Sequence, residues 1–154
     1  MKKIFIPILL LCLIPSVLFA AEMSFGVDKS SFPKGEEFLV KVYLDTDNVM
    51  VNALEGVITF PADLLELKET RDGNSSINFW IEKPASVSSG EVLFSGITAG
   101  GFSGDQRFLF SMIFESKKGG EGLIDFKNVQ VLQNDGVGTK VSTKTEPFSL
   151  VVSG

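Results

Sequence analysis

The stretch NALEGVITFP, at Asn52–Pro61, predicts a β-strand and decides the fold class. Its apolar and polar residues alternate with a period of two, the pattern of a strand that buries one face. The inward face of this strand is formed by Leu54, Gly56, Ile58 and Phe60. Pro61 has no N–H group to donate to a sheet, so we expect the strand to end there.

Gly56 stands where the alternation requires a large inward side chain. A glycine at such a position leaves space that a bulky residue from elsewhere in the core must fill, because protein interiors are close-packed. Trp80 is the only tryptophan of the chain. We therefore expect the Trp80 ring to be a core side chain that packs over Gly56.

Short apolar runs, separated by turn-forming residues, continue along the rest of the chain. A second clear alternation occupies Phe38–Asp45. A third, at Arg107–Lys117, places Phe108 on the same face as Phe110. No long helical pattern interrupts these runs. About nine strands at regular spacing predict an all-β domain built as a two-sheet β-sandwich.

The start of the chain has the pattern of a signal peptide. Two lysines precede the uncharged apolar run Ile4–Phe19, and Ala20 and Ala21 offer small residues for cleavage. We therefore expect residues 1–21 to be a signal peptide and residues 22–154 to form a single exported domain. This domain would be extracellular or at the cell surface, and it would touch a membrane only through an uncleaved signal segment.

The sequence lacks the residues that most catalytic and metal sites need. It contains no histidine, and its single cysteine, Cys12, lies in the predicted signal peptide. Catalytic Ser–His and Cys–His pairs and histidine-based zinc sites are thereby excluded. The 19 Asp and Glu residues are read as solvated surface groups rather than a glycosidase pair. We expect no enzymatic activity, no cofactor and no metal.

The charge of the chain bears on its partners. The formal net charge is −5, and no cluster of Lys and Arg interrupts the acidic balance. Nucleic acid is therefore not an expected partner, because proteins that bind it carry a basic patch.

Five sequence elements follow one another in an order shared with a known family. A Lys-Gly-Glu turn at 34–36 precedes a long alternating strand, and NALEGVITFPADLLEL at Asn52–Leu67 comes next. FSGITAGGFSG at Phe94–Gly104 then leads into RFLFSMIFESK at Arg107–Lys117. This order, over Ser24–Val152, resembles that of cohesin domains.

The resemblance implies a nine-stranded jelly-roll sandwich without catalytic activity. It also implies that the module mediates protein–protein association with a dockerin-type partner. Dockerins carry the calcium of such complexes, which assemble for polysaccharide catabolism or at cell surfaces. The chain departs from the family at Ala53 and Glu55, where dockerin-binding cohesins tend to place Asn and Asp.

Two other functions stay open on the sequence. A carbohydrate-binding module would bind a polysaccharide on exposed aromatic rings, and Tyr43 has the outward parity for this role. A structural domain of a surface or adhesive assembly would need no such ring. Phe102, within a glycine-rich loop, is expected to anchor that loop on the core.

The expected partner surface combines the outward residues of three strands. The resemblance places the strand Arg107–Glu115 beside the strand Asn52–Pro61, with Glu91–Ile97 flanking it. The predicted partner-binding residues are Glu55, Val57, Leu93, Ser95, Leu109, Ser111 and Ile113. An apolar centre with a polar rim is typical of an association site. Isolated aliphatic residues on a sheet face are also common, and they are the alternative interpretation.

Overall fold

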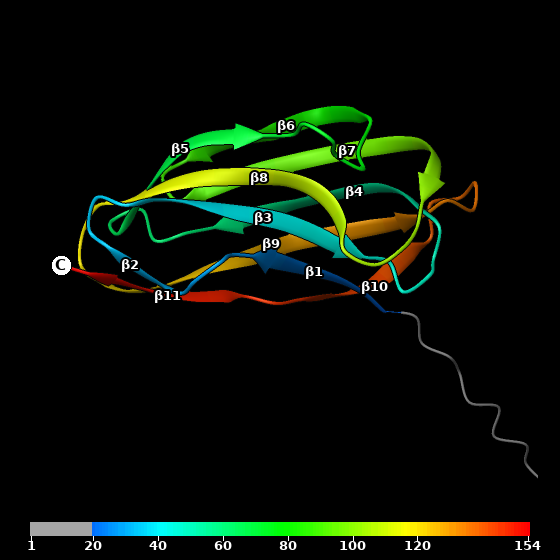
Figure 1. The fold of residues 1–154 in the computed structure, drawn as a ribbon. Coiled ribbons are helices and arrows are strands. Elements are labelled where there is room, and N and C mark those ends of the chain that lie inside the picture. The colour runs from blue at the N-terminus through cyan, green and yellow to red at the C-terminus, as the bar shows by residue number, and fades with distance from the viewer. Residues whose placement is uncertain (1–19) are drawn as a thin grey trace, which may run out of the picture.

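Eleven strands and no helix make up residues 20–154, the part of the chain that the computed structural model describes (Figure 1). The strands are β1 Ala20–Gly26, β2 Ser31–Pro33, β3 Glu37–Asp45, β4 Val51–Thr59, β5 Leu65–Arg71, β6 Phe79–Ser88, β7 Glu91–Phe102, β8 Arg107–Ser116, β9 Gly120–Gln133, β10 Lys140–Thr145 and β11 Phe148–Ser153.

Nine of these strands form one path of hydrogen-bonded neighbours that folds into two layers. The order is β5-β8-β3-β1-β10-β9-β4-β7-β6, and β11 pairs with β9 and β2. The layer of β5, β8, β3 and β1 faces the layer of β9, β4, β7 and β6 (Figure 1). Only the β1–β10 and β2–β11 pairs are parallel. This arrangement confirms the predicted all-β, nine-stranded, two-sheet sandwich of jelly-roll type.

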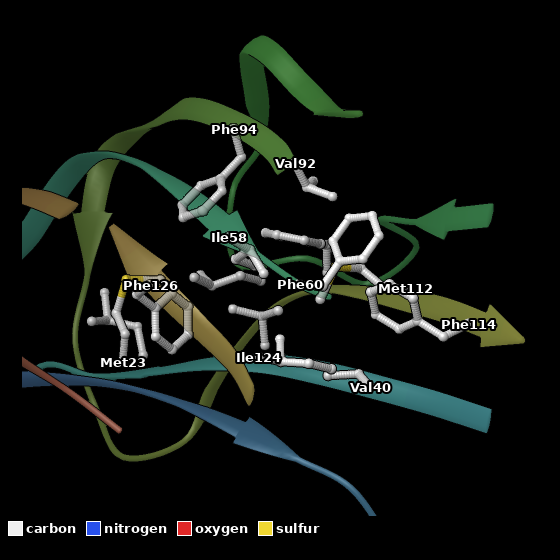
Figure 2. Close-up of a cluster of buried hydrophobic side chains, with 14 of the residues drawn as sticks. Met23, Val40, Ile58, Phe60, Val92, Phe94, Met112, Phe114, Ile124 and Phe126 are labelled. Carbon is white, nitrogen blue, oxygen red and sulfur yellow. The ribbon is translucent and has the colours of Figure 1, made fainter. Parts of the chain in front are cut away.

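The hydrophobic core lies between the two layers. Side chains of β3 and β8, such as Val40 and Phe114, point toward those of β4 and β7, such as Ile58 and Phe94 (Figure 2). The alternation predicted for Phe38–Asp45 is confirmed, because its apolar members are buried and the residues between them are not. The alternation of β4 is confirmed in the same way.

The space beside Gly56 is filled by Phe94 and not by Trp80, so that expectation is wrong. Phe94 lies directly opposite Gly56 in the β4–β7 pair, and a Cβ atom added to Gly56 would lie 2.7 Å from Phe94 Cζ. Trp80 is one strand further away and lies opposite Gly96. It is half-buried, and its ring meets the edge of Phe110 at a centroid distance of 6.0 Å. The space left by the missing side chain of Gly56 is therefore filled by the residue directly opposite it on the neighbouring strand.

A β-bulge in β8 reverses the expected parity at its start. Val42 pairs with Phe110 and Tyr43 pairs with Phe108, so Leu109 is the extra residue of the bulge. Leu109 consequently joins Phe110 in the core, with 0% of its surface exposed. Phe108, expected inside, is only half-buried and meets the ring of Tyr43.

Two strands of the β9-β4-β7-β6 layer are irregular. β6 shifts its register with β7 three times between Phe79 and Ser88. β9 is a single strand that Asn128 interrupts with a φ of 54°. Phe102 is buried, and the Arg107 guanidinium lies 5.6 Å from its ring centre. Its burial agrees with the expected anchoring role, but Phe102 is the last residue of β7 rather than part of a loop.

The predicted signal peptide lies largely outside the described residues. Only Ala20 and Ala21 are described, and they are the first two residues of β1. Cleavage of the signal peptide therefore stays a prediction. Among residues 20–154, no helix has the length and apolar character needed to cross a membrane.

Candidate partner-binding face

The outer face of the β9-β4-β7-β6 layer presents four rows of side chains that run across the strands. We call it the banded face. The first apolar row contains Leu132, Ala53, Ile97 and Phe79. The carboxylate row contains Gln130, Glu55, Ser95 and Glu82. The second apolar row contains Val57, Leu93 and Ala85, and it ends at the charged Lys127 on β9. The outer polar row contains Asp125, Thr59, Glu91 and Ser88.

The banding follows from strand geometry. Residues at i and i+2 of a strand point to the same side, so alternate residues of β4 lie outside while Leu54, Gly56 and Ile58 lie in the core. Register then places each outward residue beside its equivalent on the neighbouring strand. Ser95, for example, lies opposite both Glu55 and Glu82.

Two hollows lie in succession on this face. The first, of about 500 Å³, is bordered by Val57 and Leu93 of the second apolar row. The other, of about 190 Å³, is bordered by Ala53 and Ile97 of the first apolar row. Three residues line both hollows: Glu55, Ser95 and Ile81. The carboxylate row therefore separates two apolar depressions.

Ile81 is the most exposed aliphatic side chain among those lining the hollows. It is left over at a shift of register in the β6–β7 pair, between Trp80 and Glu82, and 61% of its surface is exposed. Phe79 is exposed to the same degree, and Ile97 is 39% exposed. Exposed apolar side chains this close together lose unfavourable contact with water when a partner covers them.

The charged groups of the banded face differ in whether they have a partner. Lys127 Nζ donates to Glu91 Oε1 at 2.7 Å, and this bond holds the pKa of the Glu91 carboxyl below its usual range. A bond from the Ser88 hydroxyl to Glu91 acts in the same direction. Within residues 20–154, Glu55 and Glu82 form no ion pair. The carboxylate row thus carries two unneutralised negative charges.

Four of the predicted partner-binding residues lie together on the banded face. Glu55 faces Ser95, and Val57 faces Leu93, in the β4–β7 pair. They occupy the middle of the two central strands of the face. Their role in binding is untested and stays a prediction.

The other three predicted residues do not join this surface. The expectation that β8 lies beside β4 is wrong, because β8 pairs with β5 and β3 in the opposite layer. Leu109 and Ser111 are buried, and Ile113 is half-buried on that other sheet. The apolar patch expected from the sequence is therefore divided between two sheets, and Leu109 is not on a surface at all.

The sequence interpretation missed the flanking strands of the banded face. Phe79, Ile81 and Glu82 come from β6. Gln130 and Lys127 come from β9, whose parity changes at Asn128. The close spacing of Phe79 and Ile81, both apolar, was the one signal in the sequence for an exposed apolar strand here.

The Tyr43 and Phe108 rings do not form a flat sugar platform. The Tyr43 ring lies over Gly26, where an added Cβ would come within 2.7 Å of Tyr43 Cε2. The Phe108 ring meets it at an interplanar angle of 65° and a centroid distance of 6.0 Å. The two rings therefore pack edge to face against each other. Among the described residues, no group of three or more acidic or cysteine side chains is placed to hold a metal ion.

Comparisons with known proteins identify the fold. No family model and no curated protein matches the sequence. Among solved structures, a cohesin module of a family 33 glycoside hydrolase from Clostridium perfringens is similar, with a TM-score of 0.73 and 15% identity. The match covers 88% of this chain and 98% of that one.

Two further cohesins have comparable similarity. The seventh ScaB type I cohesin from Pseudobacteroides cellulosolvens has a TM-score of 0.72 and 18% identity, over 89% of this chain and 94% of that one. A non-cellulosomal cohesin from the archaeon Archaeoglobus fulgidus has a TM-score of 0.71 and 17% identity, over 88% and 92%. The chain therefore has the cohesin fold, as the order of its sequence elements predicted.

Proposed function

We propose that this chain, which has the fold of a cohesin, is a non-catalytic module that binds a protein partner through its banded face. The observation that carries the proposal is the pair of apolar hollows on either side of the carboxylate row. An apolar centre of this kind, surrounded by polar groups, has the composition of a protein–protein interface.

The partner that we propose is a dockerin-type module. Cohesins of similar fold were solved as complexes with dockerins, including a type I complex from Clostridium thermocellum at a TM-score of 0.70 and 8% identity. In this chain, Glu55 stands on the outward side of β4, where the resemblance places the dockerin contact. The chain would act outside the cell or at its surface, in polysaccharide breakdown or in surface assembly.

The test is a calorimetric titration of the chain with dockerin modules encoded in the same genome, in calcium and in a chelator. Ile81→Asp and Ile97→Asp each place a charge beside a hollow and should abolish binding. Leu123→Asp and Val151→Asp are the matched controls, because these residues are 44% and 43% exposed but lie on β9 and β11 outside the banded face. The controls should bind normally. Equal binding by all four variants would place the partner site elsewhere.

A further inference from the structure

The carboxylate row of the banded face holds two glutamates that no ion pair within residues 20–154 neutralises. Glu55 on β4 and Glu82 on β6 lie on either side of Ser95 on β7, the strand between them, and among the described residues neither forms an ion pair. An apolar partner that covered both hollows would strip water from these carboxylates without replacing it. Such desolvation is unfavourable unless a hydrogen-bonding cation takes the place of the water.

The distance between the two apolar rows limits which partner segment can fill both hollows at once. Ala53 and Val57, which border the two hollows, lie four residues apart on β4, or roughly 13 Å in a strand. Glu55 lies midway between them. An α-helix rises about 1.5 Å per residue, so positions i and i+8 are roughly 12 Å apart and i+4 lies between them.

These three positions share one face of a helix. Successive residues are separated by about 100° around the axis, so i, i+4 and i+8 fall within a sector of roughly 80°. A helix placed along the strands would therefore reach the first hollow, the carboxylate row and the second hollow in order. A helix placed across the strands would meet one row and leave a hollow empty.

From these distances we infer that the partner presents a helix with the pattern apolar-x₃-Lys/Arg-x₃-apolar, whose cation binds between Glu55 and Glu82. This inference rests on the proposed function, since it concerns the same face. Lys127 does not compete for the cation's place, because its ammonium is already bonded to Glu91 at 2.7 Å. Arg suits the site best, because its planar guanidinium can donate to two carboxylates at once.

The test uses two stapled helical peptides that differ at one residue, Leu-x₃-Arg-x₃-Leu and Leu-x₃-Gln-x₃-Leu. Each is titrated into the full ¹⁵N-labelled chain and followed by NMR. The Arg peptide should shift the amides of Glu55, Ser95 and Glu82 and bind about five- to tenfold more tightly at low salt. Raising the salt concentration should reduce this preference, since the contact is electrostatic.

The double variant Glu55→Gln/Glu82→Gln should bind both peptides equally. Glu66→Gln/Glu69→Gln, on β5 of the other layer, is the control and should keep the preference for Arg. Equal binding of the two peptides by the unmodified chain would overturn the inference. A preference that persists in the Glu55/Glu82 variant, or the absence of shifts on the banded face, would overturn it as well. The dockerin titration judges the proposed function separately, because its Ile81 and Ile97 variants leave both carboxylates in place.

Discussion

Shortening Leu109 to alanine tests the bulge that sets the parity of β8. In the structure, Leu109 is fully buried beside Phe110, whereas Phe108 is half-buried and meets Tyr43 on the outer side of the sheet. Without the bulge, the alternation of the sequence would exchange these roles, burying Phe108 and exposing Leu109. With the bulge, shortening Leu109 should destabilise the fold more than shortening Phe108. Without the bulge, the order of the two losses should be reversed.

The expected magnitude follows from burial. Removing a fully buried leucine side chain costs about 2–5 kcal/mol of unfolding free energy, because transfer energy is lost and a cavity forms. At about 4 °C per kcal/mol for a domain of this size, Leu109→Ala should lower the melting temperature by roughly 8–20 °C. Phe108→Ala removes one edge-to-face contact and part of a half-exposed ring, so we expect a loss of about 1–2 kcal/mol.

Thermal and urea denaturation of the two single variants give the comparison directly. Ile113→Ala serves as the control on the same strand, because Ile113 is half-buried and lies outside the bulge. A melting temperature for Leu109→Ala close to that of the unmodified chain, together with a large loss for Phe108→Ala, would refute the bulged register.

Three other changes test separate features of the fold. Gly56→Ala should cost about 1–3 kcal/mol in urea denaturation, because its Cβ would lie 2.7 Å from Phe94 Cζ, and Phe94→Leu should recover part of that loss. Ser116→Ala should cost about 1–3 kcal/mol in a thermal melt, because the buried Ser116 hydroxyl donates to the Pro33 carbonyl at 2.7 Å; Ser116→Thr, which keeps the hydroxyl, should cost less. Asp135 accepts hydrogen bonds within the β9–β10 turn, including one from the Thr139 hydroxyl, and these lower its pKa. Since the folded pKa is lowered, the turn should lose its order only as pH falls below the usual aspartate pKa toward that lowered value. Protection factors of the turn amides, corrected for the pH dependence of intrinsic exchange, that are as high at pH 3 as at pH 6 would contradict this.

Local patterns in the sequence determined the fold class. The alternation at Phe38–Asp45 and Asn52–Pro61 places one set of residues inside whatever the neighbouring strands are, because side-chain direction alternates along any strand. The strand expected to end at Pro61 stops at Thr59, and the reason is equally local, because proline has no N–H group to donate to a sheet. The order of these elements was sufficient to identify the cohesin fold.

The pairing of strands was decided only by the tertiary structure. Gly56 signals a missing side chain, but which residue fills the space depends on the strand beside it, and that neighbour is β7 with Phe94. Likewise, Leu109 is buried because Val42 pairs with Phe110 across a bulge, and no local pattern records a partner strand's register.

The residues of the candidate site also fall into a group that the sequence predicted and a group that only strand pairing decided. The outward residues of β4 and β7 followed from alternation alone, so Glu55, Val57, Leu93 and Ser95 were found. β8 could not be excluded from their surface without the strand order, which places it in the opposite layer. The hollows depend on four strands meeting in one register, and that register arises from long-range pairing that a single stretch of sequence does not contain.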